Sequence, residues 1–291
     1  MRRTMLFVPG NSPAMLLNAD IHQADAVILD LEDAVSPTEK DAARHLVRNA
    51  IGALAYGKTE IIVRVNPLDT DYIRDDIEAI VPLKPSMLMA TKVSGPDYIA
   101  AVSRMMAETE ERHGLPVGTV GLIPLLETAE GLENAYLIAR CDKRVRALLL
   151  GAEDLSTDLQ AIRSKQGDEI LYARGRIVMA ARAAGIDVYD TPFTDVNDDE
   201  GLVKDASFAR AIGFTGKASI SPRHVPAINE VFSPSLKDIA YAREVMEVIE
   251  EGKRQGKGAV SLHGKMVDKP IVDRARRVLE AAEALGLGGA Q

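Results

Sequence analysis

Short apolar segments recur along the chain up to residue 220, and each is followed by polar or turn-forming residues. Segments that are apolar almost throughout are typical of parallel strands buried on both faces of a sheet. Between them, apolar residues recur at spacings of three and four, as in residues 42–51, which is typical of amphipathic helices. We therefore predict strands at residues 5–8, 26–30, 61–65, 87–90, 121–126, 147–150, 186–189 and 216–220.

The alternation of strand and helix predicts a parallel sheet. Eight such units in a chain of 291 residues favour an α/β fold of the (β/α)8 TIM-barrel type. An open, doubly wound sheet is the main alternative. Its commonest dinucleotide-binding form is disfavoured because no G-x-G-x-x-G pattern follows the first strand.

The strand pattern stops near residue 232, which predicts a barrel domain at residues 1–232 and a C-terminal helical extension at residues 233–291. Within the extension we expect helices at residues 236–255 and 271–287, joined by a loop. We expect no β-sheet in this extension. Such an extension should pack on the barrel or on a neighbouring subunit.

Ser36 and Glu39 have the spacing of a capping box and predict that a helix starts at this point of the chain.

Composition narrows the class of protein. The hydrophobic fraction of 46%, with no Trp, predicts an aliphatic core, and a net charge of -8 argues against a nucleic-acid partner. No apolar stretch approaches the roughly 20 residues that a membrane span requires. The N-terminus lacks the features of a signal peptide, and the lone Cys141 fits a reducing compartment, so we expect a cytoplasmic protein. A catalytic role for Cys141 is disfavoured because it lies at a predicted helix end.

Charged residues stand directly after several of the apolar segments or within them. The C-terminal ends of all strands of a barrel meet on one face, so these side chains should converge there although they are far apart in sequence. Carboxylates together with a guanidinium and an ammonium group suit a divalent metal and an anionic, oxygen-rich substrate. The residues are Asp30, Glu32, Asp33, Arg64, Lys92, Glu127, Glu153 and Asp154.

Glu127 and Asp154 are the strongest metal-ligand candidates in this group. Each alone could simply cap a helix, where the helix dipole favours a carboxylate. Together, after two consecutive strands, they form a site for a hard cation, and Mg2+ prefers one or two carboxylates plus water and substrate oxygens.

Arg64 lies inside a predicted strand, where an arginine needs a partner. It either forms a core salt bridge to Asp30 or Glu32, or directs its planar guanidinium at a substrate carboxylate or a developing enolate. We expect Asp30, Glu32 and Asp33 to hold Arg64 and metal-bound water in place, and Lys92 to form a structural salt bridge.

Asp268 and His263 are harder to interpret from spacing. An aspartate in a loop is usually solvated or forms a turn. His263 could act as a base, but the five histidines of the chain show no metal-binding spacing.

Several segments together resemble the citrate lyase beta-subunit family within the HpcH/HpaI aldolase superfamily. They are RRTMLFVPGN, ADAVILDLEDAVSPTEKDAAR, IIVRVNP, GAEDLSTDL and VSLHGKMVDKPIVDRAR, and they cover nearly the whole chain in the same order. The resemblance implies a TIM barrel with a C-terminal helical extension, commonly trimeric.

The resemblance also implies roles for individual residues. Glu127 and Asp154 match the two metal-ligating carboxylates, and Arg64 matches the arginine that binds substrate and enolate. Asp268 matches a catalytic aspartate that the neighbouring subunit supplies in related lyases. Phe7 and Pro9 match a segment that lines the thioester pocket, where Glu127 also contacts substrate.

The implied activity is Mg2+-dependent carbon–carbon cleavage of a 3-hydroxyacyl thioester, with citryl thioester giving oxaloacetate and acetyl thioester. The substrate carrier would be CoA or an acyl-carrier protein, and alpha and gamma citrate lyase subunits are possible partners. Malyl-CoA or citramalyl-CoA lyase activity and thioester hydrolysis are alternatives. A non-catalytic subunit that docks a carrier protein is an alternative of another class.

Overall fold

Eight parallel strands close into a barrel in the computed structural model of the chain, which describes residues 1–54, 56–256 and 260–287. Each strand pairs with the next one in sequence, and β8 pairs with β1. The closed barrel confirms the predicted fold and excludes the open-sheet alternative. The strands are β1 (Thr4–Pro9), β2 (Ala26–Asp30), β3 (Glu60–Arg64), β4 (Met87–Ala90), β5 (Gly121–Leu126), β6 (Ala147–Leu150), β7 (Asp187–Asp190) and β8 (Gly216–Ser219).

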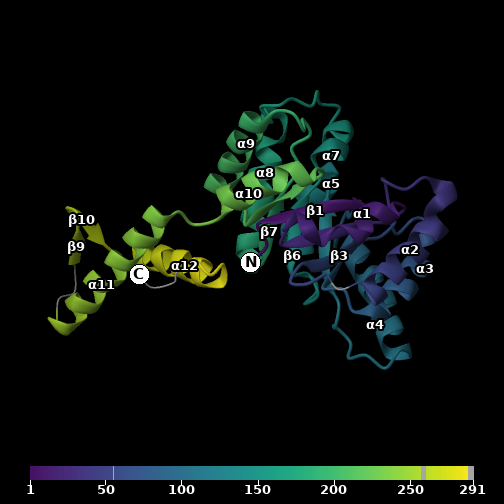
Figure 1. The fold of residues 1–291 in the computed structure, drawn as a ribbon, viewed down its shortest axis with the longest axis horizontal. Helices are drawn as coiled ribbons and strands as arrows, with labels where there is room; N and C mark the ends of the chain where they lie inside the picture. Colours follow the sequence, from purple (N-terminus) through teal and green to yellow (C-terminus); the bar gives the residue numbers. More distant parts are fainter. Residues whose placement is uncertain (55, 257–259, 288–291) are drawn as a thin grey trace. The chain divides into compact units, whose positions relative to one another are not determined.

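Helices connect these strands and surround the barrel (Figure 1). None of the described helices is both long enough and apolar enough to cross a membrane. The helices up to the end of the barrel are α1 (Pro13–Leu17), α2 (Lys40–Ala53), α3 (Tyr72–Ile80), α4 (Pro96–Arg112), α5 (Ala129–Glu133), α6 (Ala135–Arg140), α7 (Ala152–Asp158), α8 (Leu171–Ala184), α9 (Asp199–Ile212) and α10 (Val225–Phe232).

Alternate residues of the strands point into the barrel and fill it. This interior is almost entirely aliphatic, as the composition predicted, with one tyrosine among its members. Its buried residues are Met5, Ala26, Ile28, Ile62, Met87, Met89, Ile123, Leu125, Ala147, Leu149, Tyr189 and Ala218, and the partly buried Phe7 packs against them.

The predicted capping box at Ser36 does not form. A short 3₁₀ helix occupies Pro37–Glu39, and α2 begins at Lys40. The Ser36 hydroxyl donates to the Glu39 carboxylate at 3.2 Å instead of accepting from a backbone N–H group. Because Pro37 has no N–H group and favours a tight first turn, the chain makes this turn before the α-helix starts.

The chain divides into two compact units, residues 2–229 and residues 230–291 together with Met1. In the second unit α11 (Leu236–Arg254) packs against α12 (Lys269–Ala284). Ser235 and Asp238 form a capping box at the start of α11. The apolar residues that join the two helices include Ala242, Val245, Val272 and Ala275.

The expectation that this unit has no sheet was wrong. An antiparallel hairpin joins β9 (Val260–Leu262) to β10 (Lys265–Val267), whereas residues 257–259 of the expected loop lie outside the described part. His263 and Gly264 both have positive φ angles, 48° and 75°. Two such residues are typical of a type I′ turn, whose twist matches that of the flanking strands. The short strands and the His-Gly pair carry only a weak sequence signal.

Candidate functional site

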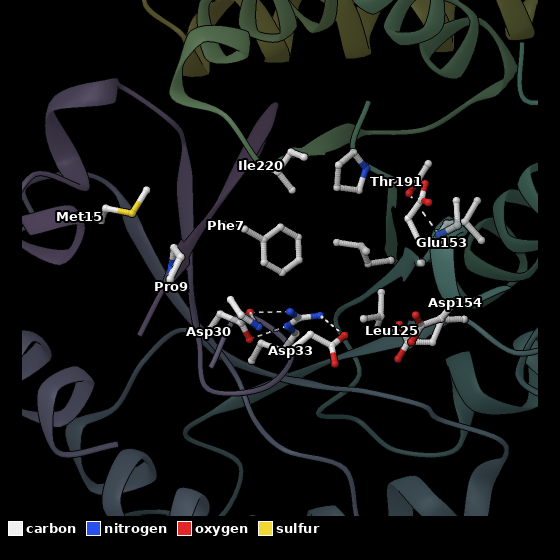
Figure 2. A pocket seen from close by; sticks show the side chains of 18 residues that line it. Phe7, Pro9, Met15, Asp30, Asp33, Leu125, Glu153, Asp154, Thr191 and Ile220 are labelled. Carbon is white, nitrogen blue, oxygen red and sulfur yellow. Dashed lines mark hydrogen bonds and ion pairs between the residues drawn. The ribbon is translucent and has the colours of Figure 1, made fainter. Parts of the chain in front are cut away.

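A cavity of about 360 Å³ opens at the C-terminal ends of the barrel strands. Its size is within the range of small-ligand pockets. In Figure 2, Asp30 and Asp154 lie on opposite sides of it, and the Phe7 ring projects between them. The structure thus brings together most of the residues predicted from the sequence: Phe7, Pro9, Asp30, Asp33, Arg64, Glu127, Glu153 and Asp154 all line the cavity.

Arg64, the last residue of β3, is held by carboxylates from the end of β2 and the loop after it. Its Nε donates to Asp30 Oδ1 at 2.7 Å and its Nη2 to Asp30 Oδ2 at 2.5 Å. Its Nη1 lies 3.1 Å from Glu32 Oε2. The guanidinium carbon also lies over the Phe7 ring, 5.0 Å from its centre, which is a cation–π contact.

The two readings of Arg64 are therefore not exclusive. The salt bridge to Asp30 and Glu32 exists, and the guanidinium lines the cavity at the same time. Burial lowers the pKa of Arg64, but the hydrogen bonds and charge of Asp30 and the charge of Glu32 outweigh it, so the pKa is raised. Two of its N–H groups donate to Asp30, and Nη1 also lies 3.7 Å from Asp33, so the guanidinium is fixed in place while its remaining N–H groups can face an anionic oxygen in the cavity.

Glu127 follows β5 and is a buried carboxylate, only 4% exposed. Its Oε1 accepts a hydrogen bond from the Lys92 backbone N–H group at 2.7 Å. Burial raises the pKa of Glu127 to about 8, and the charges of Asp154 and Glu32 act in the same direction, whereas the Lys92 hydrogen bond and the charge of Arg64 lower it. The ionised form of Glu127 therefore lacks sufficient compensation by the protein's own groups.

This environment predicts a pH-dependent stability of the metal-free protein. The folded-state pKa of Glu127 lies above the ordinary glutamate value of about 4.5, so the contribution of this group to stability is fully present below about pH 4.5 and is lost as pH rises through about 8. Between pH 5.5 and 7.5 the free energy of unfolding of the wild type should fall by about 2–3 kcal/mol more than that of Glu127→Gln. Urea denaturation in chelator measures this difference. Identical pH profiles for the two proteins would contradict it.

The donor chemistry of the site fits a divalent cation. Glu127 and Asp154 supply carboxylate oxygens in one cavity, and a cation would provide the compensation that Glu127 lacks. Within the described residues, no group of three or more His, Cys, Asp or Glu side chains is arranged to hold a metal. Two carboxylates with room for water and substrate oxygens are the set that Mg2+ prefers.

Glu32 contacts Arg64 and Lys92 contacts Glu127, but neither is among the residues that line the cavity. The Lys92 ammonium is 3.5 Å from Glu32 Oε1, so the expected structural ion pair is present. Burial raises the pKa of Glu32 to about 7, although the charge of Arg64 opposes the shift.

Asp268 belongs to the second unit and caps α12, accepting a hydrogen bond from the Ile271 N–H group at 3.2 Å. His263 is exposed and pairs with Glu244 at 2.7 Å. Cys141 lies at the C-terminal end of α6, as predicted.

Other residues that support the site were not predicted from the sequence. Lys217 on β8 is completely buried and donates to Asp190 Oδ2 and to the Thr191 carbonyl, both at 2.6 Å. Thr191 lines the cavity, and its hydroxyl accepts from the Ala152 N–H group at the start of α7. Lysine inside an apolar strand segment was the one signal that could have indicated this network.

Gly151 is required by the packing of Glu127. A Cβ atom at Gly151 would lie 2.7 Å from Glu127 Cβ and 2.8 Å from Glu127 Oε2. Any larger residue would displace the carboxylate.

Comparison with known proteins agrees with this architecture. The sequence profile of the family described as HpcH/HpaI aldolase/citrate lyase matches residues 3–222. The chain is 43% identical over 284 residues to a citrate lyase subunit beta from Leuconostoc mesenteroides subsp. cremoris, which covers 98% of this chain and 94% of that protein. It is 34% identical over 288 residues to a (3S)-malyl-CoA thioesterase from Cereibacter sphaeroides, covering 99% and 97%.

One solved structure is similar to this chain in both fold and sequence. The protein CitE from Mycobacterium tuberculosis, in complex with magnesium, acetoacetate and coenzyme A, superposes with a TM-score of 0.79. It is 30% identical, and the match covers 97% of this chain and 98% of that one. The resemblance seen in the sequence is thereby confirmed, and the chain belongs to the HpcH/HpaI aldolase/citrate lyase family.

Proposed function

We propose that this protein is a Mg2+-dependent lyase that cleaves citryl thioester to oxaloacetate and acetyl thioester. The observation that carries the proposal is the pairing of two carboxylates, Glu127 and Asp154, with the fixed guanidinium of Arg64 in one cavity. The relative named citrate lyase subunit beta, 43% identical over nearly the whole chain, supports this choice of substrate.

Each group has a part in the cleavage. The substrate hydroxyl gives its proton to the Asp268 carboxylate, the carbon–carbon bond breaks, and the electron pair of that bond passes to the thioester as an enolate while the hydroxyl carbon becomes the keto group of oxaloacetate. Mg2+ held by Glu127 and Asp154 would supply Lewis-acid polarisation of the hydroxyl and carboxylate oxygens. Arg64, partly dehydrated in the cavity, would stabilise the enolate oxygen through its free N–H groups.

The enolate carbon must then receive a proton to become the acetyl group. We assign this step to Asp268, in line with the resemblance that places it on a neighbouring subunit. We further propose that the protein is a homotrimer, because an acid at the start of α12 would then reach a partner's cavity.

The trimeric arrangement predicts complementation between two inactive variants. Glu127→Gln lacks a metal ligand, and Asp268→Asn lacks the acid but keeps a good helix cap. After random exchange at equal amounts, about one quarter of the sites in a closed ring would combine an intact barrel with an intact neighbouring tail. We expect activity to recover to that level. No recovery despite demonstrated subunit exchange would show that Asp268 does not act across an interface.

The carrier of the thioester is proposed to be an acyl-carrier protein. Arg64 is the only Lys or Arg among the described residues that line the cavity, so no cation there would pair with nucleotide phosphates of CoA. Alpha and gamma citrate lyase subunits would then be the partners that supply and reload the carrier. We also place the protein in the cytoplasm, which its single cysteine supports.

The test is product analysis with purified protein and Mg2+. Citryl-, malyl- and citramalyl-CoA are offered, and citryl phosphopantetheine on a carrier protein is offered in parallel. Oxaloacetate that disappears with chelator supports the proposal, and faster turnover of the carrier-protein ester supports the choice of carrier. Glyoxylate or pyruvate as the main product would instead indicate malyl-CoA or citramalyl-CoA lyase activity.

Hydrolysis of the thioester is a second candidate because a relative is named (3S)-malyl-CoA thioesterase. Hydrolysis releases free hydroxy acid and no keto acid, so the same assay separates the two. A carrier-docking subunit without catalytic activity would bind the carrier protein but give neither product.

A further inference from the structure

The turn after β4, residues 92–94, contains an unusual backbone conformation beside the site. Lys92 has a φ of 52°, in the left-handed region that few residues other than Gly, Asn and Asp adopt readily. Its side chain is about half exposed and makes one ion pair, to Glu32 at 3.5 Å. An ion pair of this length from a half-exposed ammonium group is too weak to explain the backbone conformation.

The conformation has a clear consequence for Glu127. It directs the Lys92 N–H group at Glu127 Oε1, at 2.7 Å. The second carboxylate oxygen lies against Gly151, where a Cβ atom would come within 2.8 Å. The carboxylate is thus fixed at one oxygen by a backbone donor and confined at the other by a glycine.

The turn at residues 92–94 is itself held in place by α5, the helix that follows Glu127. A Cβ atom at Gly131 of α5 would lie 2.3 Å from the Val93 carbonyl oxygen, so only glycine allows this close approach. The Asn134 side chain donates to the Ser94 carbonyl at 2.8 Å. Thr128, next to Glu127, caps α5 by accepting from the Gly131 N–H group. The loops after β4 and β5 therefore hold each other in place around Glu127.

We propose that Lys92 is a positioning residue that orients Glu127 through its backbone and not through its ammonium group. The strained turn fixes one carboxylate oxygen so that the other is presented to a divalent cation. This inference rests on the proposed role of Glu127 as a metal ligand. Residues that orient metal ligands typically contribute a factor of about 10–100 in metal affinity.

Two substitutions at residue 92 distinguish the effect of the Lys92 backbone conformation from the effect of its ammonium group. Lys92→Gly and Lys92→Val both remove the ammonium group, but glycine accepts a positive φ whereas the β-branched valine resists it. We expect Lys92→Val to weaken Mg2+ binding by about 10–100-fold, measured by titration calorimetry without substrate. Lys92→Gly should bind Mg2+ no more than about threefold more weakly than the wild type.

Lys84 provides a matched control at the opposite end of β4. It is also a lysine with positive φ, 57°, and it ends the short 3₁₀ helix Val81–Leu83. Lys84→Val should introduce similar strain, visible in thermal unfolding, but leave Mg2+ affinity unchanged. Equal loss of affinity in Lys92→Gly and Lys92→Val would overturn the proposal in favour of the ammonium, and no loss in either would overturn it altogether.

A metal-free measurement keeps this inference separate from the proposed function. The Lys92 amide proton should exchange with solvent at least about tenfold faster in Glu127→Ala than in the wild type, as followed by NMR in chelator. Unchanged exchange would show that the turn does not hold Glu127. If the wild type binds no Mg2+, the proposed function fails, whereas this exchange measurement still decides whether the two loops are coupled.

Discussion

Glu127→Gln is expected to lower kcat/KM by about 1000-fold, equivalent to about 4 kcal/mol of transition-state stabilisation. Glutamine fills nearly the same volume but offers a neutral oxygen to the cation. Because the buried Glu127 carboxylate lacks full compensation in the metal-free protein, the variant should fold at least as well as the wild type. Asp154→Asn should show a similar loss of activity. Mg2+ affinity by calorimetry and turnover by keto-acid release are the measurements.

Glu153→Gln is the matched control for this pair of variants. Glu153 also follows β6 and lines the cavity, but its carboxylate pairs with Arg163 at 3.0 Å and is largely exposed. We expect its activity to stay within about tenfold of the wild type, as for loss of an exposed ion pair. If Glu127→Gln and Asp154→Asn were as active as Glu153→Gln, with an unchanged Mg2+ requirement, the metal assignment would be wrong.

Arg64→Lys is expected to reduce kcat by about 100–1000-fold, in the range seen when one donor to a developing oxyanion is lost. A lysine ammonium cannot bridge both oxygens of Asp30 and keep a planar fork toward the cavity. It does keep a positive charge beside the buried Asp30 and Glu32. Arg64→Ala would instead leave the buried Asp30 without its cationic partner and Glu32 with only Lys92, and it should cost about 3–5 kcal/mol of stability.

Arg44→Lys controls for the structural part of this effect. Arg44 is a buried arginine on α2 whose Nε donates to the buried Asp76 at 2.7 Å, and it does not line the cavity. Both lysine variants should lose some thermal stability, but only Arg64→Lys should lose turnover. A loss of turnover below about fivefold in Arg64→Lys would assign Arg64 to a purely structural role.

The local pattern of apolar segments was sufficient to predict the strands of the barrel. Every predicted strand boundary lies within one residue of the observed one. In a parallel sheet buried on both faces the strands are almost continuously apolar, so each one stands out between polar turns. The same patterning failed where packing is shallow. The strands β9 and β10 of the hairpin have three residues each. In β9 two residues are partly buried and one is exposed.

The sequence alone determined which chemical groups are present at the ends of the strands, because strand order in a barrel places all those ends on one face. Strand order alone therefore predicts that Arg64, Glu127 and Asp154 share one cavity, and all three line it. The tertiary structure decided how those groups are held. The left-handed turn at Lys92, the space left by Gly151 and the buried Lys217 all depend on contacts between loops and strands distant in sequence. Such contacts leave no periodic pattern, because nearly every residue carries a backbone N–H group and a glycine or lysine in the sequence does not show which distant side chain lies against it.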